Sequence, residues 1–120
     1  MLFDEPTSKI LEAGFEARKE LGAGFLESVY EKALHATLRQ KGLNAVSQVS
    51  LQVKFRGVIV GEFYAGILIE NKVLSELKAV SRILSEHKAQ VIKYFKATGI
   101  EIGLLLNFGN AKLEYNRLHK

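Results

Sequence analysis

The spacing of apolar residues predicts two amphipathic helices in the first third of the chain. Over residues 7–21, apolar side chains recur every three or four positions, and Pro6 stands where a first helical turn tolerates proline. A glycine-rich break at 22–24 interrupts this pattern, which resumes over 25–38. Gly42 is expected to end the second helix, because glycine readily adopts the left-handed conformation found there.

An alternation with a period of two predicts a sheet in the middle of the chain. Apolar and polar residues alternate strictly over 49–55, as in a strand with one buried face. Two further runs rich in β-forming residues follow, at 58–69 and 73–80, and short polar turns separate the three. Consecutive strands joined by short turns favour an antiparallel meander.

The last third predicts one helix followed by two strands. Ser85 is a suitable N-cap for a helix that runs to Ala97 and ends at Gly99. The apolar run 100–108 fits a strand covered on both faces, and 112–118 fits a final strand. The expected inner face of this helix consists of Ala89, Ile92 and Phe95.

These elements, in the order ααβββαββ, indicate an α/β fold. A length of 120 residues with 48% apolar and 25% charged residues is typical of an ordinary globular chain. No repeat or linker interrupts it, so residues 1–120 are expected to form one domain. The absence of cysteine excludes a disulfide framework and a thiolate metal site.

Charge and hydropathy narrow the functional classes further. The acidic first residues, broken by Pro6, do not resemble a signal peptide, and charges interrupt every apolar run before it reaches the ~20 residues of a membrane span. We therefore expect a cytoplasmic protein without membrane contact. A net charge of +4 favours polyanionic partners, although the basic residues are dispersed and charge alone leaves nucleic-acid binding open.

The most informative polar residues are Glu76 and Lys78, which share one face of a predicted strand with Leu74. Burying a charge is costly unless it is paired or binds a metal. The residues could therefore form a structural ion pair or lie at a solvated edge. Alternatively, Glu76 could bind a hard cation such as Mg²⁺ while Lys78 orients water or stabilises charge on a phosphate.

Other polar residues could complete such a site. Glu27, at the start of the second helix, and Glu62 are candidate second acids, although either could simply be solvated. Gln90 and Tyr94 lie one helical turn apart, and with Lys93 and Lys96 they could meet a nucleic-acid backbone; a solvated helix edge is the alternative. The sequence has no phosphate-loop motif, and its histidines lack metal-ligand spacing.

Several segments together resemble a known family. The run Gly24-Phe25-Leu26-Glu27-Ser28-Val29-Tyr30 matches the motif of the GxxExxY proteins, a group of small prokaryotic proteins within the PD-(D/E)XK nuclease-like superfamily. The resemblance extends through Ser75–Val80, the Gln90–Tyr94 helix and the stretches 96–99 and 104–109. It implies a restriction-endonuclease-like αβββαβ core with a mixed central sheet and helices on both faces.

The resemblance also implies a role for each part of the site. Glu76-Leu77-Lys78 corresponds to the E-x-K element, and Gln90 to Tyr94 corresponds to the Q-x-x-x-Y helix of related nucleases. Catalytic residues would be Glu76 and Lys78; the metal ligands would be Glu27, Glu76 and the carbonyl of Leu77; and the substrate-binding residues would be Gln90, Lys93 and Tyr94. The aspartate that usually completes the metal site is replaced by Gly66, which should weaken binding of Mg²⁺.

Two functions follow from these expectations. The first is a Mg²⁺-dependent nuclease acting on DNA or RNA, with activity reduced by Gly66. The second is a catalytically inactive module of the same fold that binds nucleic acid or protein. A homodimer formed through an edge strand is a further expectation.

Overall fold

The computed structural model describes residues 5–119, which form three helices and five strands in the predicted order ααβββαββ. The elements are α1 (Glu5–Leu21), α2 (Glu27–Gln40), β1 (Ala45–Phe55), β2 (Val58–Ile69), β3 (Val73–Lys78), α3 (Ser85–Thr98), β4 (Ile102–Asn107) and β5 (Glu114–His119). Most boundaries lie within a few residues of the predicted ones. The largest difference is at β1, which begins four residues earlier than the strict alternation.

All five strands form one mixed sheet in the order β1-β2-β3-β4-β5. The first three pair antiparallel, which confirms the predicted meander. β4 lies parallel to β3, and β5 lies antiparallel to β4. The parallel pair requires a crossover connection, and α3 provides it.

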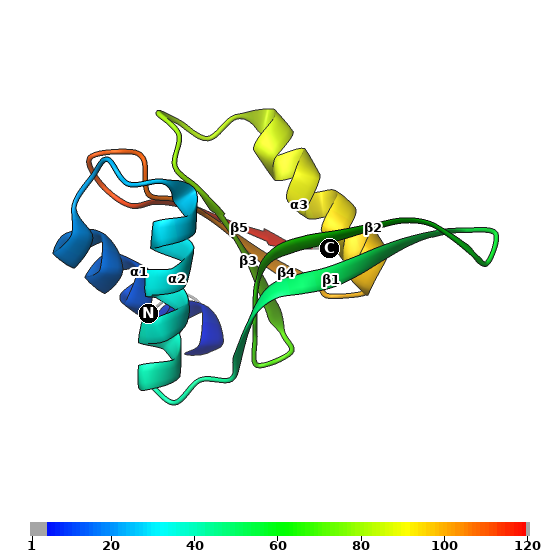
Figure 1. Cartoon of the computed structure of the whole chain (residues 1–120), viewed down its shortest axis with the longest axis horizontal. Helices are drawn as coiled ribbons and strands as arrows, with labels where there is room; N and C mark the ends of the chain where they lie inside the picture. Colours follow the sequence, from blue (N-terminus) through cyan, green and yellow to red (C-terminus); the bar gives the residue numbers. More distant parts are fainter. Residues whose placement is uncertain (1–4, 120) are drawn as a thin grey trace.

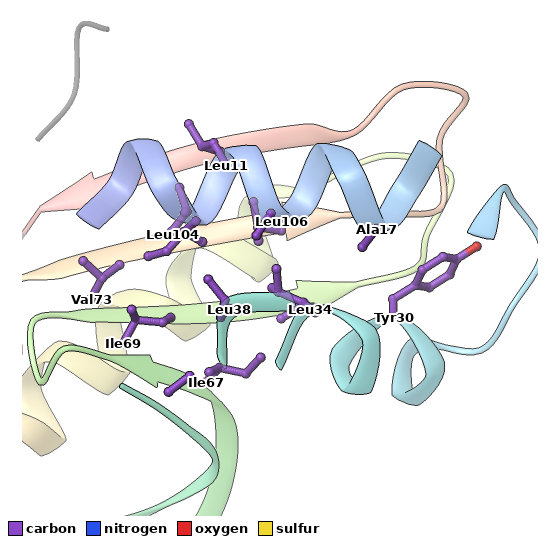
Figure 2. Packing of buried hydrophobic residues seen from close by; sticks show 14 of the residues in the cluster. Leu11, Ala17, Tyr30, Leu34, Leu38, Ile67, Ile69, Val73, Leu104 and Leu106 are labelled. Carbon is purple, nitrogen blue, oxygen red and sulfur yellow. The ribbon is translucent and has the colours of Figure 1, made fainter. Parts of the chain in front are cut away.

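Helices cover both faces of the sheet (Figure 1). On one face, apolar side chains from α1 and α2 pack against β2, β3 and β4 in the largest buried cluster (Figure 2). Leu34, Leu38 and Ile67 are completely buried there. Burial of each such side chain stabilises the folded state by roughly 1.5–3 kcal/mol relative to leaving it exposed. On the other face, α3 packs through Val91 and Phe95 against Leu105.

The strands β1 and β2 continue beyond the rest of the sheet as a two-stranded arm, which projects to the right in Figure 1. We call residues 49–65 of this ribbon the arm. It begins where Gln48 and Gly66 lie opposite each other, between the paired residues Ser47/Ile67 and Val49/Ala65. Both Gln48 and Gly66 have a φ of +54°, so both strands bend at the same level. The arm ends in a tight turn at Arg56 and Gly57, both with positive φ.

Two details of α3 differ from the prediction. Ala89 and Ile92 are exposed, whereas Val91, Tyr94 and Phe95 are buried. Gly103 allows this rotation, because a Cβ there would lie 2.5 Å from a Val91 methyl group. Ser85 is the first helical residue rather than the N-cap; the main-chain N–H of Leu84 is satisfied by the ring of His87, at 2.9 Å. Gly99 does end the helix, with a φ of +75°.

None of the helices that the structure describes is both long and apolar enough to cross a membrane.

Candidate functional site

Glu76 is the buried acid at the centre of the candidate site. Its side chain is 8% exposed, and its Oε2 atom has no hydrogen-bond partner. The ladder between β2 and β3 ends at the pair Ile67 and Ser75, so Glu76 lies just beyond the point where β2 bends away. A buried carboxylate oxygen without a partner is costly, and its presence requires an explanation.

The environment of Glu76 favours its protonated form. The pKa of this carboxyl is raised from 4.5 to about 7, chiefly because the group is buried; Lys78 acts in the opposite direction, and Glu27 and Glu31 contribute to the increase. A carboxyl with a pKa near neutrality can change its charge under physiological conditions. Perturbed groups of this kind are concentrated at functional sites.

Lys78 lies two residues further along β3 and contacts α3 instead of Glu76. Its Nζ donates a hydrogen bond of 3.1 Å to Oε1 of Gln90. In the part of the chain that the structure describes, no salt bridge joins Lys78 to Glu76, although the ammonium still lowers the pKa of that carboxyl. Neither the ion pair nor the solvated edge considered above is therefore present at Glu76.

The segment that carries the GxxExxY pattern positions the start of α2. The Tyr30 hydroxyl donates a 2.7 Å hydrogen bond to the carbonyl of Gly22 and accepts a 3.3 Å hydrogen bond from the N–H of Phe25. The Tyr30 ring is buried and stacks on Phe108 at a centroid distance of 4.9 Å. Gly24, with a φ of +99°, allows the loop to turn into the helix. The motif tyrosine thus has a structural role.

Glu27 is the first residue of α2 and extends the site from the other side of the sheet. It is more exposed than Glu76, yet partial burial raises the pKa of its carboxyl, Lys78 and His87 lower that pKa, and Glu31 raises it. Because Glu27 and Glu76 each interact with Lys78, the structure brings together the two acids and the lysine that the sequence singled out.

Gly66 occupies the position beside Glu76 where an aspartate was expected. A Cβ built on Gly66 would lie 3.3 Å from Oε2 of Glu76, so a side chain here would point at the site. The same Cβ would lie only 2.2 Å from the carbonyl oxygen of Ser75. The backbone at position 66 therefore accepts only glycine, and any larger residue would require β2 or β3 to move.

The residues of α3 divide between the core and an open groove. Tyr94 is 5% exposed, and its ring packs 5.2 Å from that of Phe63, so it presents no free face for stacking. Burial, together with the nearby carboxylates Glu76 and Glu27, raises the pKa of Tyr94 to about 12. Lys93 is exposed, as is Lys96 one turn later.

The groove lies between α3 and the arm and has a volume of about 1740 Å³. Its floor includes Leu51 and Phe63, and Gln90 lies on its wall. Since Gln90 also accepts the hydrogen bond from Lys78, the groove leads to the polar residues of β3. A ligand lying in it could reach Lys78.

The donor set fits a cation only in part. The unpartnered oxygen of Glu76 is a suitable hard ligand, and Glu27 is a second carboxylate nearby. Leu77, whose main-chain carbonyl is the third expected ligand, pairs with Leu106 in the β3–β4 ladder. However, no group of three or more acidic or histidine side chains suited to a metal occurs within residues 5–119. Glu62 lies on the arm, where it accepts hydrogen bonds from Tyr64 and Gln52.

Asn107 is a buried polar residue that the sequence analysis did not single out. Its Oδ1 accepts hydrogen bonds from the N–H groups of Val80 and Gly109, and its Nδ2 donates to the carbonyl of Val80 and to Glu114. The carboxamide thus joins the end of β4 to the segment directly after Lys78. A single asparagine in an otherwise apolar strand was the available sequence signal.

Replacing Asn107 with alanine is expected to lower the free energy of unfolding by about 2 kcal/mol, because two partly buried main-chain groups of Val80 lose their partner. Asn110→Ala, an exposed position in the following loop, should change it by less than about 0.5 kcal/mol. Urea denaturation of both variants measures the difference. Equal stability would show that the Asn107 carboxamide contributes nothing to the fold.

Comparisons with known proteins agree with this architecture. A family model described as the PD-(D/E)XK nuclease superfamily matches residues 4–118. Among solved structures, the one titled "Crystal structure of SSO0001" is similar, with a TM-score of 0.61 and 17% identity over 78% of this chain and 49% of that chain. At this identity the likeness concerns the fold alone, and the present chain spans about half the length of that protein. No curated protein matches.

Proposed function

This chain belongs to the PD-(D/E)XK nuclease superfamily, and from that premise we propose that it is a Mg²⁺-dependent nuclease that hydrolyses phosphodiester bonds of DNA or RNA. We further propose that it is a member of the GxxExxY group, because Gly24, Glu27 and Tyr30 have the spacing of that motif. Gly66 leaves the metal site with fewer ligands and lowers its affinity.

One observation carries the proposal, namely the buried carboxylate of Glu76 whose Oε2 has no partner. Folding gains nothing from such a group, because an apolar residue of similar size would be more stable there. A bound divalent cation would compensate the cost and keep Glu76 ionised. The arrangement is therefore explained by ligand binding better than by stability.

The residues divide into three roles. Glu76, Glu27 and the carbonyl of Leu77 would hold Mg²⁺, which when bound polarises a phosphodiester and favours ionisation of water. Lys78, oriented by Gln90, stabilises negative charge on the phosphate or positions the attacking water. Lys93 is proposed to contact the strand in the groove, whereas the buried Tyr94 is proposed to support the groove surface from beneath through its contact with Phe63.

A second candidate is a catalytically inactive module that binds nucleic acid or protein. It is favoured by Gly66, which supplies no oxygen ligand, and by the absence of a three-residue acidic cluster among residues 5–119. A homodimer through the edge strand β1 also remains a proposal, since this strand pairs only with β2 in the sheet that the structure describes.

A cleavage assay separates the two candidates. Radiolabelled DNA and RNA are incubated with the protein and Mg²⁺ or Mn²⁺, and with EDTA as the blank. We expect metal-dependent cleavage that falls by about 100-fold or more in Glu76→Gln and in Lys78→Met. Glu20→Gln, a matched change of an exposed carboxylate on α1 away from the site, should leave the rate unchanged.

Calorimetric titration of Mn²⁺ completes the test. Saturable binding that disappears in Glu76→Gln supports the nuclease, even when turnover is slow. No cleavage and no cation binding by the unaltered protein would eliminate the nuclease and favour the binding module.

A further inference from the structure

The arm exposes an unusual concentration of large apolar side chains. Val53, Phe55, Val58, Ile59 and Val60 are 39%, 58%, 62%, 52% and 60% exposed, respectively. They lie on β1 and β2 around the tip of the ribbon, where Phe55 pairs with Val58. Contiguous exposed apolar residues on a projecting element mark an interaction surface more often than an accident of folding.

The charge of the arm and the groove specifies the kind of partner. The arm carries two basic residues, Lys54 and Arg56, and one acidic residue, Glu62, which accepts hydrogen bonds from Gln52 and Tyr64. Arg56 lies over the ring of Phe55, 5.0 Å from its centroid, at the tip. Across the groove, α3 adds Lys93 and Lys96, so that the residues lining the groove include three lysines and one acid, Glu86.

We propose that the arm binds duplex DNA, entering the major groove as a two-stranded ribbon while Lys93 and Lys96 contact the phosphate backbone. This inference rests on the proposed function, since it names the substrate class of the same site. The major groove of B-form DNA admits a two-stranded β-ribbon. The apolar tip would contact thymine methyl groups or base edges, and the cations would neutralise phosphates.

The same features disfavour other partners. The major groove of duplex RNA is deep and narrow, so a ribbon cannot enter it. Single strands are bound mainly by exposed aromatic rings on which successive bases stack. Tyr94 is buried against Phe63. The exposed rings of Phe55 and Tyr64 lie at opposite ends of the arm, and Arg56 lies over Phe55, so they form no continuous stacking surface. A second copy would bring Lys54 and Arg56 of one arm close to those of the other when the apolar tips met, which costs free energy through repulsion of like charges.

Fluorescence anisotropy in EDTA measures binding without cleavage. The full chain is titrated onto duplex DNA, duplex RNA and single-stranded DNA of one sequence over a series of salt concentrations. Duplex DNA is expected to bind most tightly. In the double variant Lys54→Ala/Arg56→Ala, the Kd should rise roughly tenfold and the slope of log K against log salt should fall in magnitude by about 2, because two phosphate contacts are lost.

The double variant Lys19→Ala/Lys112→Ala is the matched control. It removes the same charge from two exposed positions on α1 and the β4–β5 loop, away from the arm, and should keep the slope of the unaltered protein. A third variant, Val58→Ser/Ile59→Ser, should weaken duplex binding without changing the slope. Thermal unfolding of each variant verifies that the fold is retained.

An unchanged slope in Lys54→Ala/Arg56→Ala, or an equal loss in the control, would overturn the inference. So would equal affinity for duplex RNA or single strands. Light scattering that shows arm variants dissociating a dimer, with duplex binding unaltered, would identify a second copy as the partner instead. Because all binding is measured without metal, its result does not depend on the nuclease assay. If the arm binds duplex DNA but the protein cleaves nothing, the inference about the arm holds and the proposed nuclease activity is eliminated.

Discussion

Replacing Glu76 with glutamine is expected to make the protein more stable than the unaltered chain by about 3 kcal/mol at alkaline pH and about equally stable at acidic pH. The reason is the pKa of Glu76, which is 4.5 ordinarily and about 7 in the folded protein. The difference between these values corresponds to about 3 kcal/mol of folding free energy.

The sign follows from proton binding. Because the folded state holds the proton more tightly than the unfolded state, the contribution of Glu76 to stability is fully present below pH 4.5 and is lost as the pH rises through about 7. Glutamine cannot ionise, so Glu76→Gln removes this loss. Urea denaturation in EDTA at a series of pH values measures both proteins.

Glu62→Gln is the matched control, since its carboxylate lies on the exposed arm and accepts its hydrogen bonds there. Its stability should follow that of the unaltered protein at each pH. Parallel curves for Glu76→Gln and the unaltered chain would contradict the assignment of Glu76 as a buried, unpaired acid. Added Mn²⁺ should reduce the difference at alkaline pH if the site binds the cation.

The substitution Gly66→Ala is expected to lower the free energy of unfolding by about 3 kcal/mol or more. Two costs combine: a φ of +54° disfavours any residue with a Cβ, and that Cβ would lie 2.2 Å from the carbonyl oxygen of Ser75. Either β2 or β3 must move to relieve the contact. Chemical denaturation monitored by circular dichroism provides the measurement.

Gly57→Ala separates the two costs. Gly57 also has a positive φ, of +81°, but no atom lies within 4 Å of its added Cβ. Its substitution should cost only about 1 kcal/mol, the conformational penalty alone. If Gly66→Ala cost no more than Gly57→Ala, the close approach of Gly66 to β3 would be excluded.

Gly66 connects the candidate site with the arm. The glycine allows β2 to bend opposite Gln48, which separates the arm from β3, and it provides no carboxylate beside Glu76 from β2. Gly66→Asp would add the missing oxygen ligands, but it meets the same obstacles as Gly66→Ala. We therefore expect it to restore a metal site only if the strand straightens.

Much of the fold was predictable because it depends on local order. Helices and strands impose periods of 3.6 and 2 on the residues that they bury, and these periods predicted all eight elements in their order. The same alternation placed Glu76 and Lys78 on one face of β3. Short turns between β1, β2 and β3 were sufficient to predict their antiparallel pairing.

The candidate site was predictable only in its composition. The sequence and its family resemblance named Glu27, Glu76 and Lys78, but spacing could not determine whether Glu76 would be paired, solvated or buried alone. That outcome depends on where β2 leaves β3 and on Gln90 accepting the hydrogen bond from Lys78. These contacts join residues far apart in the chain, so no local pattern encodes them.

Local sequence patterns were thus sufficient to predict the element order, the meander and the strand face of the acid and the lysine. Contacts between distant segments fix the bend at Gln48 and Gly66, the buried face of α3 and the network of Asn107. α3 illustrates the reason: it has apolar residues on more than one side, and the inward side was selected by the space above Gly103 on a different element. Periodicity specifies which residues can be buried together, whereas packing between distant segments determines which of them are.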